Sequence, residues 1–134
     1  MNVDVEVQVI EDLPIEKIER YVDLCVFGVA RNVLDFTLSD NRFPYLTGEL
    51  QRSAMAEGVR QEAQNTYYLG AEGVDYAEKV WQYPQETTKW TNPDTYAQWY
   101  VKVYENKKEL ITQNAIDNAI RSVKWQKTTL KIKI

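Results

Sequence analysis

Alternation of apolar and polar residues marks both ends of the chain. Residues 3–9 read VDVEVQV, with a valine at every second position. Leu130, Ile132 and Ile134 alternate with lysines in the same way. A period of two with β-branched residues predicts half-buried strands, and a charged outer face is typical of strands at the edge of a sheet.

A three- and four-residue spacing of apolar positions predicts one long helix over residues 12–40. Asp12 can cap its N-terminus, and Pro14 suits its first turn. Gly28 costs this helix ~1 kcal/mol relative to alanine, which close packing against another helix would explain. The predicted buried stripe consists of Ile15, Ile18, Val22, Cys25, Val26, Val29, Val33 and Phe36.

The same spacing predicts a second long helix that begins at Asn92 or Asp94 and continues to about Ser122. Between the two helices, Thr47 resembles the cap of a short helix over residues 48–55. The apolar positions of the second long helix are Tyr96, Trp99, Tyr100, Val103, Leu110, Ile111, Ala115, Ile116, Ala119, Ile120 and Val123.

The segment after the short helix is rich in valine and tyrosine and predicts a β-hairpin. Residues 66–69 and 74–81 are its expected strands, joined by the turn GAEG at 70–73. Residues 56–64 are a candidate further strand, and residues 83–93, which contain two prolines, are an expected loop. The element order indicates an α+β fold in which two long helices pack on a small, mainly antiparallel sheet with a β-hairpin.

The length and the residue counts limit the possible functions. A chain of 134 residues corresponds to one domain, so we expect a single domain over 1–134, with residues 1–10 and 124–134 as extended arms or edge strands. The absence of histidine excludes Ser-His-Asp triads, Cys-His pairs and His-ligated metal sites. The single cysteine, Cys25, allows no internal disulfide, and its place on the apolar stripe favours a small buried hydrophobe over a reactive thiol.

Grouped carboxylates are the remaining catalytic candidates. Glu72, Asp75 and Glu78 could in principle serve a small hydrolase such as a glycosidase. Nothing in the sequence indicates that two of them converge in a cleft, so surface charge is the better interpretation. We therefore expect no enzymatic activity, no metal and no cofactor.

Charge is unevenly distributed. The chain carries 16 basic and 20 acidic residues, a net charge of −4, but residues 1–40 hold nine acids and three bases (−6) and residues 118–134 hold five bases and no acid (+5). The two ends are either solvated faces or complementary surfaces that meet a neighbouring copy or other partners.

Net acidity argues against a dedicated nucleic-acid binder. Because no apolar run reaches the ~18–20 residues of a membrane span and the acidic N-terminus is unlike a secretory signal, we expect cytoplasmic synthesis and no membrane partner.

Ten aromatic residues lie between positions 67 and 104. They could form a core beneath the hairpin and the second helix, a protein interface, or a platform on which sugars stack. The candidate interface residues are Tyr76, Trp81, Tyr83, Trp90 and Trp99, together with Lys131 and Lys133 in the basic end.

Three blocks of sequence in order along the chain form a recognisable pattern. They are FPYLTGELQRS at 43–53, VDYAEKVWQYP at 74–84 and NPDTYAQWY at 92–100. Together with the long helix before them, they resemble the small minor capsid and neck proteins of tailed bacteriophages, especially those that infect Gram-positive hosts. The chain lacks the histidine that the family often carries. The family pattern P-x-x-T-G-x-L-x-x-S is matched by Pro44, Thr47, Gly48, Leu50 and Ser53.

The resemblance implies a small α+β assembly component of the head–tail connector, located in the virion and made in the cytoplasm of a bacterial host. Such proteins form rings in the neck, so the implied partners are other copies of the chain and neighbouring connector and tail proteins, with DNA in the channel as a possible non-specific neighbour. The terminal segments could add strands to neighbours, and their opposite charges would suit head-to-tail contacts. Folding alone explains Pro44, Thr47 and Gly48, so we interpret them first as scaffold and second as interface. The alternative function is an aromatic-rich module that binds carbohydrate or cell wall.

Overall fold

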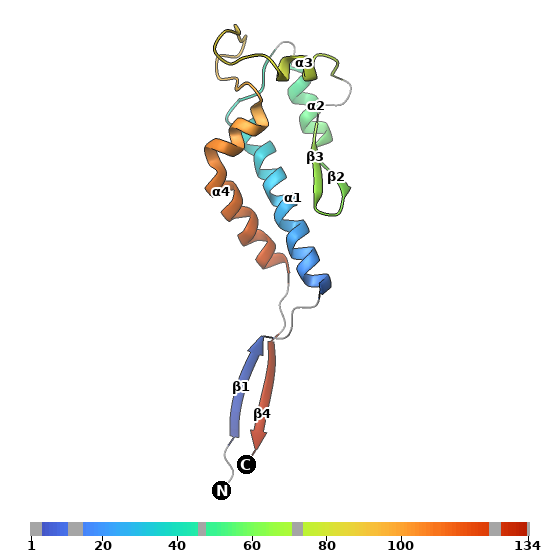
Figure 1. The fold of residues 1–134 in the computed structure, drawn as a ribbon, viewed down its shortest axis with the longest axis vertical. Coiled ribbons are helices and arrows are strands. Elements are labelled where there is room, and N and C mark those ends of the chain that lie inside the picture. The colour runs from blue at the N-terminus through green and yellow to red at the C-terminus, as the bar shows by residue number, and fades with distance from the viewer. Residues whose placement is uncertain (1–3, 11–14, 46–47, 71–73, 124–126, 134) are drawn as a thin grey trace.

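Two long helices, α1 (Ile15–Ser39) and α4 (Trp99–Ser122), run antiparallel and side by side through the body of the molecule (Figure 1). The structure is a computed structural model that describes residues 4–10, 15–45, 48–70, 74–123 and 127–133. The long helices and the antiparallel strand pairs confirm the predicted α+β class. The other elements are β1 (Asp4–Ile10), α2 (Glu49–Glu57), β2 (Val59–Ala63), β3 (Thr66–Leu69), α3 (Ala77–Trp81) and β4 (Lys127–Lys133).

The two long helices come very close where two small residues face each other. A Cβ atom placed on Gly28 would lie only 2.9 Å from the Cβ of Ala115, whereas carbon atoms in ordinary contact are ~3.5–4.0 Å apart. Val33 and Ile111 are buried in a cluster on the same pair of helices. Close packing against α4 therefore explains the glycine inside α1, an explanation that the sequence offered without proving it.

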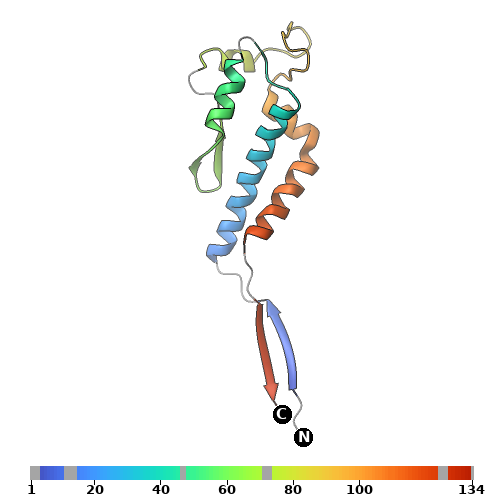
Figure 2. The same ribbon diagram turned by 180° about the vertical axis from the view of Figure 1, so that it is seen from behind.

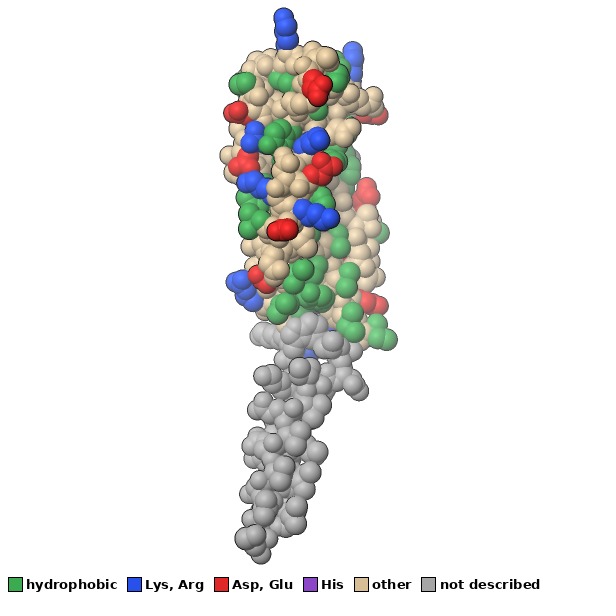
Figure 3. Space-filling model, turned by 60° about the vertical axis from the view of Figure 1, so that its left-hand side comes forward, with side chains coloured by type: hydrophobic (Ala, Val, Ile, Leu, Met, Phe, Trp, Pro, Cys, Tyr) green, Lys and Arg blue, Asp and Glu red, His purple; other side chains and the backbone are tan. Residues whose placement is uncertain are grey.

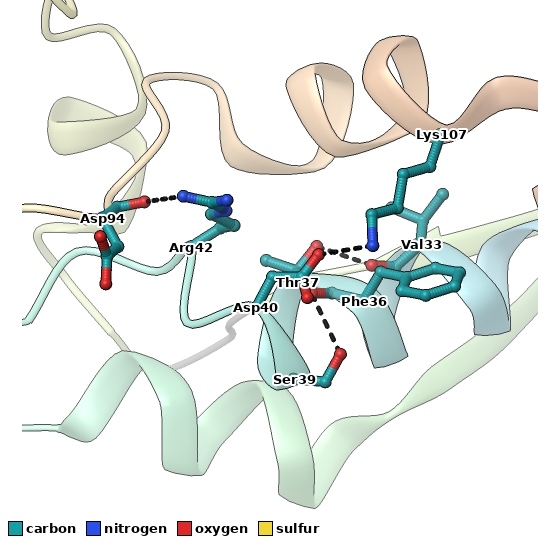
Figure 4. Close-up of polar contacts among 8 residues, drawn as sticks. All are labelled: Val33, Phe36, Thr37, Ser39, Asp40, Arg42, Asp94 and Lys107. Carbon is teal, nitrogen blue, oxygen red and sulfur yellow. Dashed lines mark hydrogen bonds and ion pairs between the residues drawn. The ribbon is translucent and has the colours of Figure 1, made fainter.

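The two helices are also joined where α4 bends. Lys107 has backbone angles of φ −124° and ψ 23°, which are not helical. Its Nζ lies 2.9 Å from Oδ2 of Asp40, just after α1, and 4.2 Å from the centre of the Phe36 ring (Figure 4). On the last turns of α1, the Thr37 hydroxyl donates to the carbonyl of Val33 at 2.6 Å. The bend of α4 is thus tied to the C-terminal end of α1.

The hairpin of β2 and β3 packs along α1, which runs between this hairpin and α4 in Figures 1 and 2. Its turn residue Asn65 has a φ of 61°, in the left-handed region that asparagine tolerates. Asp23 on α1 accepts hydrogen bonds from the N–H of Asn65 at 2.9 Å and from the hydroxyl of Tyr67 at 2.6 Å. The Tyr67 ring also meets Phe27 edge to face, with centroids 5.4 Å apart. Desolvation and, second, the bond to Asp23 raise the pKa of Tyr67 to about 12.

Strands β1 and β4 pair antiparallel and form a ribbon that extends beyond the helical body (Figures 1 and 2). The register sets Asp4 opposite Lys133 and Glu6 opposite Lys131. Acidic residues from the start of the chain and basic residues from its end are therefore neighbours within one molecule. We call this pair of strands the β1–β4 ribbon.

The prediction that residues 74–81 form the partner strand of β3 is wrong. β3 pairs with β2, which lies inside the candidate strand at 56–64, and Ala77–Trp81 form the helix α3. Packing against the core favours a helix over a strand here, because the three-residue spacing brings four apolar residues of this segment into one core cluster. These residues are Val74, Ala77, Val80 and Trp81. The predicted turn GAEG includes residues 71–73, which lie outside the described residues.

The predicted start of the second long helix is also wrong, since α4 begins at Trp99. Gln98, just before it, has a left-handed φ of 50°. Asn92, one of the two predicted start residues, instead donates from its side chain to the backbone carbonyl of Phe43, as the nearby Thr95 does. A tertiary contact thus occupies one of the two residues that the pattern assigned to the helix start.

The apolar stripe of α1 is buried along only part of its length. Val33 is buried, whereas Ile15 and Ile18 are 73% and 41% exposed. Cys25 is partly buried and lines an open apolar groove of about 400 Å³ between α1 and α4. Figure 3 shows hydrophobic side chains gathered at the end of the body next to the ribbon. The expectation of one continuous buried stripe is therefore wrong for the first half of α1.

Candidate functional site

Aromatic rings from three segments meet at the end of the body opposite the ribbon. Phe43 is fully buried, with its ring centroid 6.0 Å from that of Trp99 and 5.7 Å from that of Tyr100. Trp81 of α3 meets Trp99 nearly perpendicularly at 4.7 Å. Edge-to-face rings at such distances attract each other beyond what their buried area contributes. We call this region, with the loop between α3 and α4, the aromatic end.

Side-chain hydrogen bonds hold the segment before α4 against the segment after α1. Nδ2 of Asn92 donates to the backbone carbonyls of Asn41 and Phe43, both at 2.8 Å. The hydroxyl of Thr95 donates to the same carbonyl of Phe43 at 3.2 Å. Asn92 is 7% and Thr95 1% exposed, so these bonds satisfy polar groups that water does not reach.

Gln85 fixes the loop between α3 and α4. Its Nε2 donates to the carbonyl of Thr95 at 3.0 Å, and its Oε1 accepts a hydrogen bond from the N–H of Ala97 at 2.6 Å. Arg42 adds a bond from Nη1 to the carbonyl of Asp94 at 3.1 Å (Figure 4). The loop is therefore held by specific side chains and not by its own backbone alone.

The three sequence blocks that carry the phage resemblance pack together in this region. The first block supplies Phe43 and Leu50, the second supplies Val74, and the third supplies Trp99, all buried in one core cluster. Asn92 of the third block also binds the backbone of Phe43 in the first. The blocks are thus separate in sequence but form one unit in space.

The residues of the P-x-x-T-G-x-L-x-x-S pattern occupy scaffold positions where the structure describes them. Pro44 and Leu50 are buried, and Ser53 is partly buried on α2. Gly48 precedes α2 with a φ of 78°, a conformation that strains any residue with a Cβ. Thr47, the predicted helix cap, lies outside the described residues.

An open pocket of about 340 Å³ lies between α3 and the loop that follows it. Tyr76, Tyr83 and Trp90 line it, with Lys79 and Lys89 beside them. The rings of Tyr83 and Trp90 lie 6.4 Å apart at a tilt of 46°. Within the described residues, the buried hydroxyl of Tyr76 has no hydrogen-bond partner. Three of the five predicted aromatic interface residues thus share one pocket.

A second pocket, of about 530 Å³, also borders α3. Trp81 and Tyr100 line it together with the carboxylates of Asp75 and Glu78. Burial raises the pKa of Tyr100 well above its ordinary value. Glu72, the third carboxylate of the hydrolase hypothesis, lies outside the described residues.

The remaining candidate interface residues lie in two other places. Trp99 is 3% exposed and belongs to the core, so it offers no surface for a partner in this structure. Lys131 and Lys133 lie on β4 of the ribbon, which is at the opposite end of the molecule from α3 (Figure 1). Trp81 lines the second pocket, and the structure separates the other six candidates into a pocket group, a core residue and a ribbon group.

Several residues that hold the segments of the fold together carry no signal in the sequence. The pattern marks Asn92 as a possible helix start and as part of the third block but does not show its contact with Phe43, although an Asn-Pro dipeptide is a turn signal. Gln85 of the loop, Lys107 at the bend of α4 and Asp23 at the hairpin are not marked by any pattern. No local pattern distinguishes these three from other polar residues, because each acts through a partner distant in the sequence.

The described part of the chain contains no group of three His, Cys, Asp or Glu side chains placed to hold a metal ion. Within the same ranges, no helix combines the length and the apolar character needed to cross a bilayer. Comparisons with protein-family models, with curated proteins and with solved structures found no match.

Proposed function

We propose that this protein is a structural, non-catalytic component of the neck of a tailed bacteriophage, where it forms a ring between the head and the tail. The observation that carries the proposal is the three-block resemblance, together with the packing of Phe43, Val74 and Trp99 into one core. Three blocks that depend on each other for burial form a more specific pattern than one short motif would.

The proposed partners are other copies of the chain in the ring and neighbouring connector and tail proteins, with DNA passing through the channel. Tyrosine and tryptophan are enriched at protein interfaces because they supply large contact areas with a polar group at one end. We therefore assign the pocket of Tyr76, Tyr83 and Trp90 to contact with a neighbouring connector or tail protein.

Deletion of the gene from a phage that carries it tests this proposal. Electron microscopy should show filled heads and free tails that fail to join, and mass spectrometry should detect the chain in purified wild-type virions. A plasmid copy of the wild-type gene should restore joining. Joined, infectious particles from the deletion strain, or virions without the chain, would sink the proposal.

A point variant sharpens the same test. Tyr83→Ala with Trp90→Ala removes two rings of the pocket and leaves the core of Phe43 and Trp99 in place. This double variant should fold but complement the deletion poorly. If the double variant complemented the deletion fully, the pocket would not be part of the proposed interface.

A module that binds carbohydrate or cell wall is the second candidate, favoured by the same aromatic pocket. Titration of the purified protein with cell-wall fragments should then change its tryptophan fluorescence. The change should be lost in Trp90→Phe, since Trp90 lines the pocket and Trp99 is buried. Unchanged fluorescence at high glycan concentration, with no binding by calorimetry, would reject this candidate.

A further inference from the structure

The β1–β4 ribbon has two chemically different faces. Residues alternate between the faces of a strand, so the register assigns each facing pair to one side of the ribbon. Val5 opposite Ile132 and Val7 opposite Leu130 fall on one side. The acid–base pairs, Asp4 with Lys133 and Glu6 with Lys131, fall on the other.

The ribbon is incomplete as a sheet. Among the described residues it consists of two strands of seven residues each, so each strand pairs along one edge and has no partner strand there along its outer edge. Figures 1 and 2 show the ribbon standing clear of the long helices and of the hairpin. Isolated two-stranded ribbons are marginally stable in water, and unpaired edges readily accept another strand.

We propose that the outer edge of β1 in one copy pairs with the outer edge of β4 in the next copy, so that neighbouring ribbons join into one continuous sheet. This deepens the ring-forming part of the proposed function and rests on it. Copies related by rotation about an axis along the strands place β1 beside an antiparallel β4 of the neighbour. The contact between copies therefore repeats the antiparallel pairing found within each copy.

Charge selects this pairing over the symmetric alternative. Pairing of β1 with β1 would give Asp4 and Glu6 no basic partner, because β1 contains no base, and pairing of β4 with β4 would bring lysines together. Like charges on facing strand positions are destabilising, whereas opposite charges stabilise the pair. When β1 of one copy pairs with β4 of the next, the acidic strand lies beside the basic strand at every contact between copies.

The same choice sets the type of assembly. An interface that joins two different edges is heterologous, and it closes into a ring when the rotation between copies divides a full turn without a shift along the axis; otherwise it continues as a filament. In the ring each copy uses both of its outer edges, and no edge remains open. Pairing of β1 with β1 alone would instead give a dimer of two ribbons in which both β4 edges remain open.

Disulfide trapping between copies tests which edges meet. The Cys25→Ser variant contains no cysteine. In this background, Glu6→Cys is made in one preparation. Thr129→Cys, Lys131→Cys or Lys133→Cys is made in a second preparation. Facing positions of an antiparallel pair are close enough for a disulfide, so mild oxidation of the mixtures should give the β1–β4 heterodimer as the main product. Glu19→Cys, on α1 outside the ribbon, is the control for random collision. Heterodimers no more abundant than with this control, or mainly Glu6→Cys homodimers, would overturn the proposal.

Charge reversal provides a second test in the full chain. Asp4→Lys with Glu6→Lys makes a ribbon rich in bases, and Lys131→Glu with Lys133→Glu makes one rich in acids. Each variant alone should lose the oligomer, and their mixture should recover it in mass photometry. Glu16→Lys with Glu19→Lys, the same charge change on α1, should retain the oligomer. Oligomers that persist in either ribbon variant, or a mixture that stays monomeric, would contradict pairing through these edges.

The outcomes separate this inference from the proposed function. A chain that is found in purified virions but fails both ribbon tests would leave a neck protein that assembles through another surface. A chain that passes both ribbon tests but is absent from virions would form a ring with a different role.

Discussion

The aromatic end and the β1–β4 ribbon are built in opposite ways. At the aromatic end, segments far apart in sequence share one core, and Asn92, Thr95 and Gln85 satisfy backbone groups across it. At the ribbon, two strands pair with each other, and the nearby first turns of α1 expose Ile15 and Ile18. One end is complete within a single chain, whereas the other presents apolar positions and unpaired edges.

This contrast separates two classes of residue. Residues of the aromatic end should govern the free energy of unfolding of the single chain. Residues of the ribbon should govern association, and they should leave the free energy of unfolding almost unchanged, as should the exposed Ile15 and Ile18.

Trp99→Ala should have the largest effect on stability. Its side chain is buried against Phe43, Trp81 and Tyr100, and removal of a buried aromatic ring costs about 3–5 kcal/mol. Chemical denaturation followed by circular dichroism measures this loss. Trp90→Ala, at the open pocket, is the matched control and should cost less. A loss below about 1 kcal/mol for Trp99→Ala would show that the aromatic end is not the stable part.

Asn92→Ala should follow. It removes two hydrogen bonds to buried carbonyls, and an unsatisfied buried polar group costs about 1–3 kcal/mol. Asn92→Asp, which keeps the acceptor oxygen but loses both donors, should be destabilised similarly. Asn106→Ala, an exposed asparagine on α4, should leave the denaturation midpoint unchanged. Equal denaturation midpoints for all three variants would show that the hydrogen bonds of Asn92 do not stabilise the aromatic end.

Tyr67→Phe tests the hairpin contact, and its effect should depend on pH. Loss of the bond to Asp23 should cost about 0.5–1.5 kcal/mol at pH 7. The folded-state pKa of Tyr67, about 12, lies above its ordinary value of 10.0. The bond therefore contributes fully below pH 10 and is lost as the pH rises through about 12. The difference in unfolding free energy between wild type and variant should shrink over this range. Tyr68→Phe serves as the control, and a difference that stays constant with pH would contradict the assignment.

Ile15→Ser combined with Ile18→Ser should have the smallest effect on stability. Ile15 is 73% and Ile18 41% exposed, so the free energy of unfolding of the single chain should change by about 0.5 kcal/mol. Thermal unfolding at low protein concentration measures this. A large loss would mean that the first half of α1 is covered within the chain, which would remove the contrast between the two ends.

The sequence predicted the α+β class, the long helices and the strands at both ends because hydrophobic periodicity is a local property. Gly28 raised the question of close packing, since a glycine inside a helix costs stability, but only the structure shows Ala115 against it. It failed at residues 74–81, where valine and tyrosine content indicated a strand. There the helical spacing of Val74, Ala77 and Val80 toward one core outweighed composition.

The candidate site was predicted only in part. Tyr76, Tyr83 and Trp90 were selected by residue type, and the structure places them in one pocket. Trp99 was selected on the same ground but lies in the core, because residue type does not determine which side of a helix is covered. Gln85 could not be found from the sequence, since its role depends on carbonyl and amide groups that only the folded loop brings together.

The central claim is that the chain is stable alone at its aromatic end and is completed by other copies at its ribbon. Native mass spectrometry of the full-length protein at micromolar concentration tests this most directly. The account predicts one closed oligomer of a single copy number, which Asp4→Lys with Glu6→Lys converts to a folded monomer of unchanged helix content. A wild-type protein that is monomeric at this concentration, or a ribbon variant that retains the oligomer, would contradict it.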